Sequence, residues 1–85
     1  MKTFEYTIKD EAGIHARPAG MLAKTAKEFE SEITVKKGDS EANAANIMQL
    51  MALCAKCGET IKISVSGEDE ADAAEAIENF LNATL

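Results

Sequence analysis

Hydrophobic and polar residues alternate along four short stretches of the chain, a pattern typical of strands that bury one face. These stretches lie at about 4–8, 32–36, 41–44 and 61–66. The last is the most regular, because Ile61, Ile63 and Val65 alternate with lysine and serine. The turn-forming segment 37–39 joins the second stretch to the third, so we expect these two strands to form a hairpin.

Three other stretches place hydrophobic residues three and four positions apart, as an amphipathic helix requires. They cover about 16–29, 47–54 and 70–82. Pro18 fits the start of the first helix, because N–H groups in the first turn have no hydrogen-bond acceptor within the helix and proline lacks this group. In the second helix we expect Asn46 to be the N-cap, Gln49 to complete a capping box and Gly58 to end the helix. The predicted buried face of this helix consists of Ile47, Leu50, Met51 and Cys54.

The elements follow one another in the order β-α-β-β-α-β-α, with no internal repeat, linker or low-complexity segment between them. Three helices and one mainly antiparallel sheet predict an α+β fold of two layers with a single core. The 85 residues suffice for one domain and are too few for two, so residues 1–85 are expected to form a single domain.

The charge balance excludes several classes of function. Nine Lys and Arg against fifteen Asp and Glu give a net charge of −6, which argues against general binding of nucleic acid. No apolar run approaches the ~20 residues needed to cross a membrane, and the first residues lack the apolar stretch of a signal peptide. We therefore expect a cytoplasmic protein with no nucleic-acid partner and no membrane insertion.

Two cysteines, Cys54 and Cys57, form a C-x-x-C pair. A structural zinc site needs four ligands, and the chain adds only one histidine to this pair. A redox pair usually precedes a helix, whereas this one falls where a helical pattern ends. We expect two reduced, partly buried thiols and no metal site. The alternative of a metal-binding or redox module predicts tight binding of zinc or copper that is lost in Cys57→Ser.

The stretch Gly13-Ile14-His15-Ala16-Arg17-Pro18-Ala19 places the only histidine where a loop meets the start of a helix. The free N–H groups and the positive end of a helix dipole favour an anion at this point. Arg17 adds a permanent positive charge with donors that match phosphate oxygens. Pro18 fixes the backbone of the first helical turn, and Gly13 gives conformational freedom to the loop that leads into it.

Histidine can act as a covalent nucleophile, because a neutral ring nitrogen is available at the pH of the cell. At an anion-binding helix end, that nitrogen suits a phosphoryl group better than an acyl group. The chain contains no Walker-type loop, so a carrier charged by one protein and discharged by another fits better than a stand-alone enzyme. The alternative, left open by the spacing, is that His15 only caps the helix.

The segment 13–19 resembles the active-site signature of HPr, the histidine-containing phosphocarrier family of the bacterial phosphoenolpyruvate:sugar phosphotransferase system. The resemblance extends over the whole chain, in its length, its order of elements, and the segments 47–48 and 55–58. It implies an HPr-like open-faced β-sandwich, a four-stranded antiparallel sheet in the order 1-4-2-3 with three helices on one face.

The resemblance also implies a function. His15 would accept a phosphoryl group on Nδ1 from phosphorylated enzyme I and pass it to the IIA domain of a sugar permease. Arg17 and the backbone N–H groups of Ala16 and Arg17 would stabilise the group, and Pro18 would set the geometry. No cofactor is implied, and we expect a monomer.

The docking surface of the family lies on the first two helices. The corresponding residues are Met21, Lys24, Lys27, Ile47, Met48, Gln49 and Met51. An exposed apolar patch with lysines at its rim is also what a transient interface requires. The alternative, that some of these side chains belong to the core, is favoured for Leu50 and Met51.

The chain departs from the family pattern at a position that is used for regulation. Many members of the family carry a serine at the start of the second helix, which a kinase phosphorylates in some bacteria, and this chain has Asn46 there. We expect that switch to be absent.

The stretch 40–44 leaves open a second function, as a regulatory carrier of a nitrogen-related or dihydroxyacetone-kinase branch. An acyl carrier is poorly supported, because the chain contains strands and lacks the Asp-Ser-Leu attachment motif.

Overall fold

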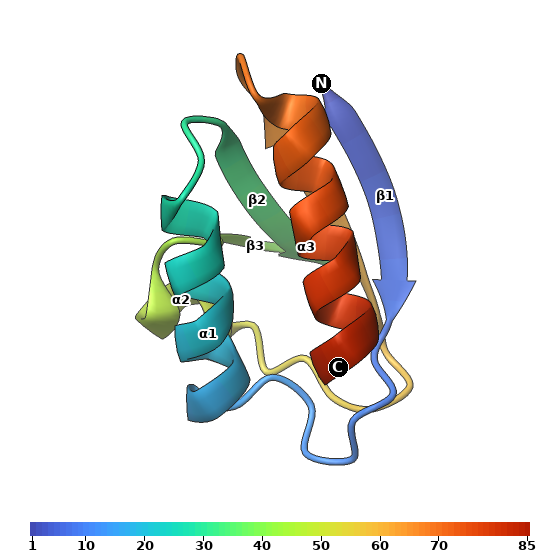
Figure 1. Ribbon diagram of the computed structural model, residues 1–85. Coiled ribbons are helices and arrows are strands. Elements are labelled where there is room, and N and C mark those ends of the chain that lie inside the picture. Colours follow the sequence, from blue (N-terminus) through green and yellow to red (C-terminus); the bar gives the residue numbers. More distant parts are fainter.

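The computed structural model describes all residues from 1 to 85 and contains four strands and three helices in the predicted order (Figure 1). The strands are β1 (Lys2–Thr7), β2 (Glu32–Lys37), β3 (Ser40–Asn43) and β4 (Thr60–Ser66). The helices are α1 (Ala16–Lys27), α2 (Ile47–Ala52) and α3 (Glu70–Thr84). No helix combines the length and the apolar character needed to cross a bilayer.

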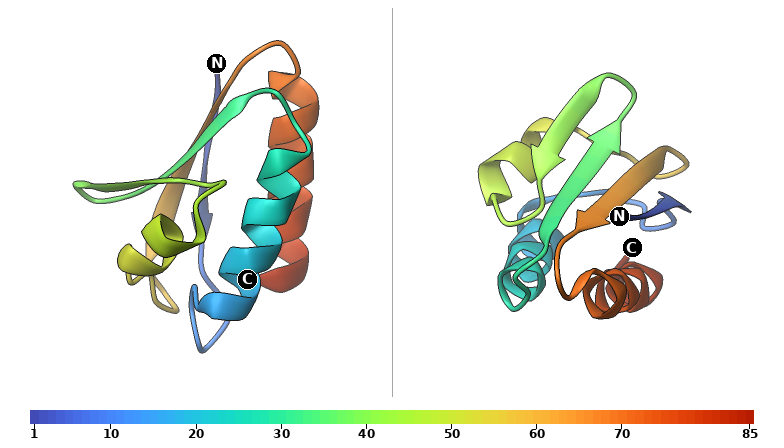
Figure 2. Two further views of the ribbon diagram at one scale, coloured as in Figure 1. Left: turned by 90° about the vertical axis from the view of Figure 1, so that its left-hand side faces the viewer. Right: turned by 90° about the horizontal axis from the view of Figure 1, so that it is seen from above.

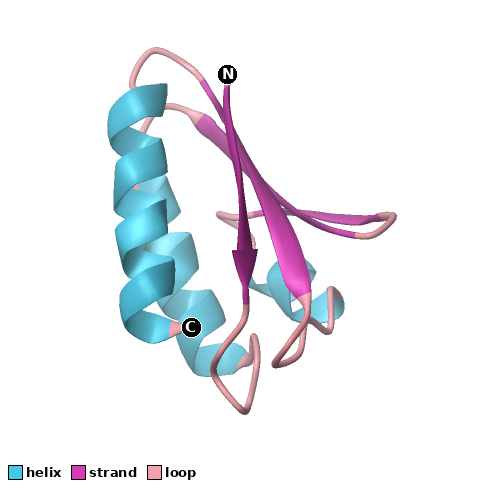
Figure 3. Cartoon of the chain, turned by 90° about the vertical axis from the view of Figure 1, so that its right-hand side faces the viewer, coloured by secondary structure: helices cyan, strands magenta, loops and turns pink.

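The four strands form one antiparallel sheet in the order β1-β4-β2-β3. The register places Ile63 of β4 between Phe4 of β1 and Val35 of β2. Figure 2 shows α1 and α3 side by side on one face of this sheet, while the other face stays open, and Figure 3 shows the same two layers from the opposite side. The predicted α+β fold and the strand order 1-4-2-3 are confirmed.

The core lies between the sheet and the helices. Val35 and Ile63 point into it from the sheet, and Leu22 and Ile77 from α1 and α3, and none of these four side chains is accessible to solvent. They belong to one connected cluster of 20 buried residues. Because each strand alternates buried and exposed positions, its polar residues form the open face of the sheet.

The carboxylate of Asp69 ties the loop before α3 to the loop before β2. Its Oδ2 accepts the N–H of Glu30 at 2.9 Å, and its Oδ1 accepts both the N–H of Ser31 at 2.9 Å and the hydroxyl of Ser31. The hydrogen bond from the Ser31 hydroxyl, followed by that from Glu30, lowers the pKa of Asp69. The ionised carboxylate is therefore the form that holds these loops together.

The predicted buried face of α2 is wrong at three of its four positions. Within the helix only Leu50 is buried, whereas Ile47 and Met51 are 40% and 39% exposed and Cys54 lies on the surface. The helix has six residues and packs beside α1 and β3 at the edge of the molecule. A helix of fewer than two turns in that position directs only one of its side chains to the core. Leu53, the C-cap of α2, is also buried.

The ends of α2 also differ in part from the prediction. Asn46 is the N-cap, and its Oδ1 accepts the N–H of Gln49 at 3.1 Å. The capping box is not closed, because the Gln49 side chain accepts the N–H of Asn43 at 2.8 Å. The residue with left-handed backbone after the helix is Cys54, with φ of 53°, and Gly58 lies in a later turn. The expectation of partly buried thiols is wrong, since both cysteines are exposed and unpaired.

Candidate functional site

The loop from β1 to α1 is held in place by the segment between the two cysteines. Ile14 donates its N–H to the carbonyl oxygen of Ala55 at 3.0 Å. Gly13 has φ of +66° and packs directly against the same backbone, so closely that a Cβ at this position would lie 2.4 Å from the Ala55 oxygen. The backbone of residues 13 and 14 is thus fixed immediately before His15.

His15 is the N-cap of α1 by its backbone but not by its side chain. Its extended backbone, with φ of −124° and ψ of −174°, lets its carbonyl accept the N–H of Ala19 at 2.9 Å. The imidazole makes no capping hydrogen bond and is exposed. The imidazole therefore does not cap the helix with a hydrogen bond of its own, and its ring is accessible to solvent.

The first turn of α1 presents free donors beside this ring. Ala19 is the first residue whose N–H bonds to a carbonyl four positions back, and Pro18 has no N–H. The N–H groups of Ala16 and Arg17 consequently have no partner within the helix. No acidic residue lies in this turn. The positive end of the helix dipole and the Arg17 guanidinium together make it an environment for an anion.

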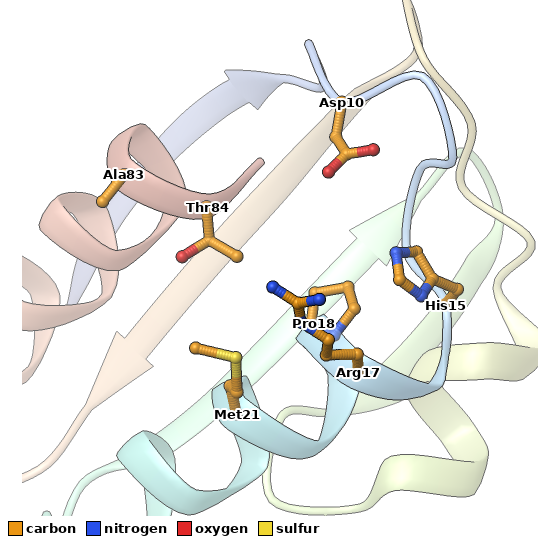
Figure 4. A pocket seen from close by; sticks show the side chains of 7 residues that line it. All are labelled: Asp10, His15, Arg17, Pro18, Met21, Ala83 and Thr84. Carbon is orange, nitrogen blue, oxygen red and sulfur yellow. The ribbon is translucent and has the colours of Figure 1, made fainter.

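His15, Arg17 and Pro18 line a cavity of about 310 Å³ (Figure 4). Its walls are formed by Asp10, His15, Arg17, Pro18, Met21, Ala83 and Thr84. Figure 4 shows the side chains of Asp10 and Arg17 reaching into one space, with Thr84 at the end of α3 across from them. Sequence reasoning missed Ala83 and Thr84, because no local pattern indicates that the end of α3 lies beside the start of α1. It also missed Asp10, because the alternation of residues does not show that the turn from Asp10 to Gly13 brings this side chain to His15.

The residues predicted for docking come together on α1 and α2, which pack side by side (Figure 1). Met21, Ile47, Met48 and Met51 are the large hydrophobic side chains exposed on this surface, and Met48 is the most exposed at 76%. Lys24 and Lys27 lie in the last turn of α1, and neither forms an ion pair. Gln49 is exposed, although its side chain is engaged with Asn43. We call this surface, formed by the seven predicted residues, the docking face.

Comparison with known proteins decides the family. A family model described as "PTS HPr component phosphorylation site" matches residues 2–83. The phosphocarrier protein HPr of Mycoplasma capricolum is 41% identical over 81 residues, which are 95% of this chain and 91% of that protein. The chain belongs to the HPr family of phosphocarrier proteins.

Two solved HPr structures resemble this fold closely. The histidine-containing phosphocarrier protein of Mycoplasma superposes with a TM-score of 0.94 at 38% identity, covering 98% of this chain and 94% of that one. An HPr dimer from Thermoanaerobacter tengcongensis gives a TM-score of 0.77 at 37% identity, covering 98% and 95% of the two chains. Dimers thus occur among HPr structures, and the monomeric state expected for this chain stays a prediction.

Proposed function

We propose that this HPr-family protein carries a phosphoryl group on Nδ1 of His15 between two larger proteins. Phosphorylated enzyme I, charged from phosphoenolpyruvate, is the donor, and the IIA domain of a sugar permease is the acceptor, both acting in the cytoplasm. The observation that carries the proposal is the exposed His15 ring, which lacks a side-chain hydrogen bond and stands beside two free N–H groups and Arg17.

The chemistry is a nucleophilic displacement at phosphorus in each direction. The lone pair of a His15 ring nitrogen forms the new N–P bond while the bond from phosphorus to the donor breaks, its electron pair returning to the donor. The N–H groups of Ala16 and Arg17 and the Arg17 guanidinium supply donors to the phosphoryl oxygens. In the second step a nucleophile of the acceptor forms a bond to phosphorus while the N–P bond breaks, and its electron pair returns to the His15 ring nitrogen. The carrier is then free again, and no cofactor is required.

The docking face supports an exchange between two partners in turn. It combines exposed methionines, whose flexible side chains adapt to different surfaces, with two unpaired lysines. The helices α1 and α2 carry no acidic side chain, although the whole protein has a net charge of −6. We infer that enzyme I and the IIA domain each present an apolar patch with acidic residues at its rim.

The test is phosphorylation in a reconstituted system. The protein is incubated with enzyme I and phosphoenolpyruvate, and the intact mass is followed together with peptide mapping. We expect one phosphoryl group on His15, released in acid, and no label in His15→Ala. Labelling of His15→Ala, or no gain of mass in the wild type, contradicts the proposal.

A panel of acceptors separates the transport branch from the regulatory one. The phosphorylated protein is mixed with sugar-specific and nitrogen-branch IIA proteins and with the dihydroxyacetone-kinase acceptor. Transfer to the sugar-specific proteins is expected. Transfer to a regulatory acceptor alone rejects the transport assignment and leaves the carrier chemistry in place.

A further inference from the structure

Asp10 is the only acidic side chain that lines the cavity at His15. It is held in place by its own loop. Its Oδ1 accepts the N–H of Ala12 at 2.8 Å, and its carbonyl oxygen accepts the N–H of Gly13 at 2.9 Å. A carboxylate fastened at one oxygen within a tight turn cannot swing into solvent without breaking that turn. Its charge is therefore a fixed feature of the cavity.

Arg17 is the only permanently positive side chain in the same cavity. Asp10 and Arg17 reach into one space from the two ends of the loop (Figure 4), yet they form no ion pair. The second carboxylate oxygen of Asp10, Oδ2, accepts no hydrogen bond. The cavity thus holds one negative and one positive side chain that attract each other across the space in front of His15.

We propose that Asp10 is a positioning residue that sets how readily His15 gives up its phosphoryl group. In the unphosphorylated carrier its charge draws the Arg17 guanidinium over the cavity. In the phosphorylated carrier it competes with the phosphoryl group for Arg17 and repels the added negative charge. Asp10 consequently favours the unphosphorylated form. This inference rests on the proposed phosphorylation of His15.

A carrier has to bind the phosphoryl group stably and still release it to the acceptor, and a negative side chain near His15 affects this balance. The helix N–H groups and Arg17 all stabilise a bound phosphoryl group. A carrier that holds its group too firmly cannot pass it on, so a fixed opposing charge raises its tendency to transfer. A phosphoryl group carries up to two negative charges. For one unit charge that acts on a phosphoryl group through a partly solvated space, Coulomb's law gives an effect of roughly threefold to tenfold on the equilibrium.

The test compares two variants that remove one negative charge from adjacent positions. Asp10→Asn keeps an oxygen for the Ala12 N–H and removes the charge from the cavity. Glu11→Gln makes the same change at an exposed neighbour that does not line the cavity. Each protein is equilibrated with catalytic enzyme I at fixed ratios of phosphoenolpyruvate to pyruvate, and the phosphorylated fraction is read from the intact mass.

We expect the ratio of phosphorylated to unphosphorylated Asp10→Asn to exceed the wild-type ratio by roughly threefold to tenfold, and the difference to shrink in 1 M salt. Glu11→Gln should match the wild type. Equal ratios in the two variants, or a lower ratio in Asp10→Asn, overturn the inference. Circular dichroism checks the fold, and if Asp10→Asn unfolds, Asp10→Ser, whose hydroxyl can also accept within the turn, takes its place. A wild-type protein that gains no phosphoryl group refutes the proposed function instead.

Discussion

Replacing Gly13 with alanine is expected to destabilise the fold far more than the same replacement at Gly38, although the two glycines have similar backbone angles. Their φ values are +66° and +57°. Alanine pays about 1–2 kcal/mol for a left-handed backbone at either site. The surroundings differ, because a Cβ at Gly13 would lie 2.4 Å from the Ala55 oxygen and 2.9 Å from Cα of Lys56, whereas a Cβ at Gly38 would meet nothing within 4 Å.

The magnitude follows from what must move. Both atoms that a Cβ at Gly13 would meet belong to the backbone, so the two segments have to separate rather than a flexible side chain give way. Overpacking of this kind costs about 1–3 kcal/mol. Separation also weakens the bond from the Ile14 N–H to the Ala55 oxygen, which contributes about 1 kcal/mol. We therefore expect a loss of about 3–6 kcal/mol for Gly13→Ala and about 1–2 kcal/mol for Gly38→Ala.

Urea unfolding followed by far-ultraviolet circular dichroism measures both losses. The midpoint should fall in each variant with little change in slope, since the surface exposed on unfolding is the same. A Gly13→Ala variant as stable as Gly38→Ala would show that the contact with Ala55 does not hold the His15 loop. The account of how that loop is positioned would then be rejected.

Four further predictions concern transfer, acid stability, regulation and docking. Arg17→Ala should slow phosphoryl transfer by about tenfold to a hundredfold without abolishing it, because one charge-assisted contact contributes about 1.5–3 kcal/mol; single-turnover kinetics with enzyme I measures this, and an unchanged rate removes Arg17 from the site. The pKa of Asp69 is lowered chiefly by the Ser31 hydroxyl, so its contribution to stability is complete above the unfolded pKa of about 4 and is lost as the pH falls through the lower folded value. In Asp69→Asn the free energy of unfolding, measured in urea, should fall less steeply as the pH is lowered from about 5 to 3. The same pH dependence as in the wild type contradicts a stabilising role for the ionised Asp69. A kinase that phosphorylates the regulatory serine of HPr should label Asn46→Ser but not the wild type, whereas Asn46→Ala should lose about 1 kcal/mol because the cap of α2 disappears. Met48→Glu should slow transfer from enzyme I by about tenfold, with the free energy of unfolding changed by less than about 0.5 kcal/mol because Met48 is exposed; equal rates in the two proteins place the interface elsewhere.

The sequence by itself determined the number, type and order of the elements. Alternation marked the inner faces of β2 and β4, and helical spacing marked Leu22 and Ile77, because these periodicities report which side of an element is apolar. The cap at Asn46 and the junction at His15 were also readable, since both depend on neighbours within one turn. The order of the strands came instead from the resemblance to HPr, because alternation does not say which strands are neighbours.

Only the tertiary structure decided which apolar side chains remain exposed and which groups surround His15. Ile47 and Met51 have the spacing of core residues, but α2 lies at the edge of the molecule and turns them outward. Asp10 and Thr84 come from opposite ends of the chain and line one cavity because the residues after α3 pair with the β1–α1 loop, where Asp10 donates its N–H to the carbonyl oxygen of Leu85 at 2.8 Å. Periodicity describes one element in isolation, whereas exposure and the composition of a cavity depend on what packs against that element, and no local pattern carries that information.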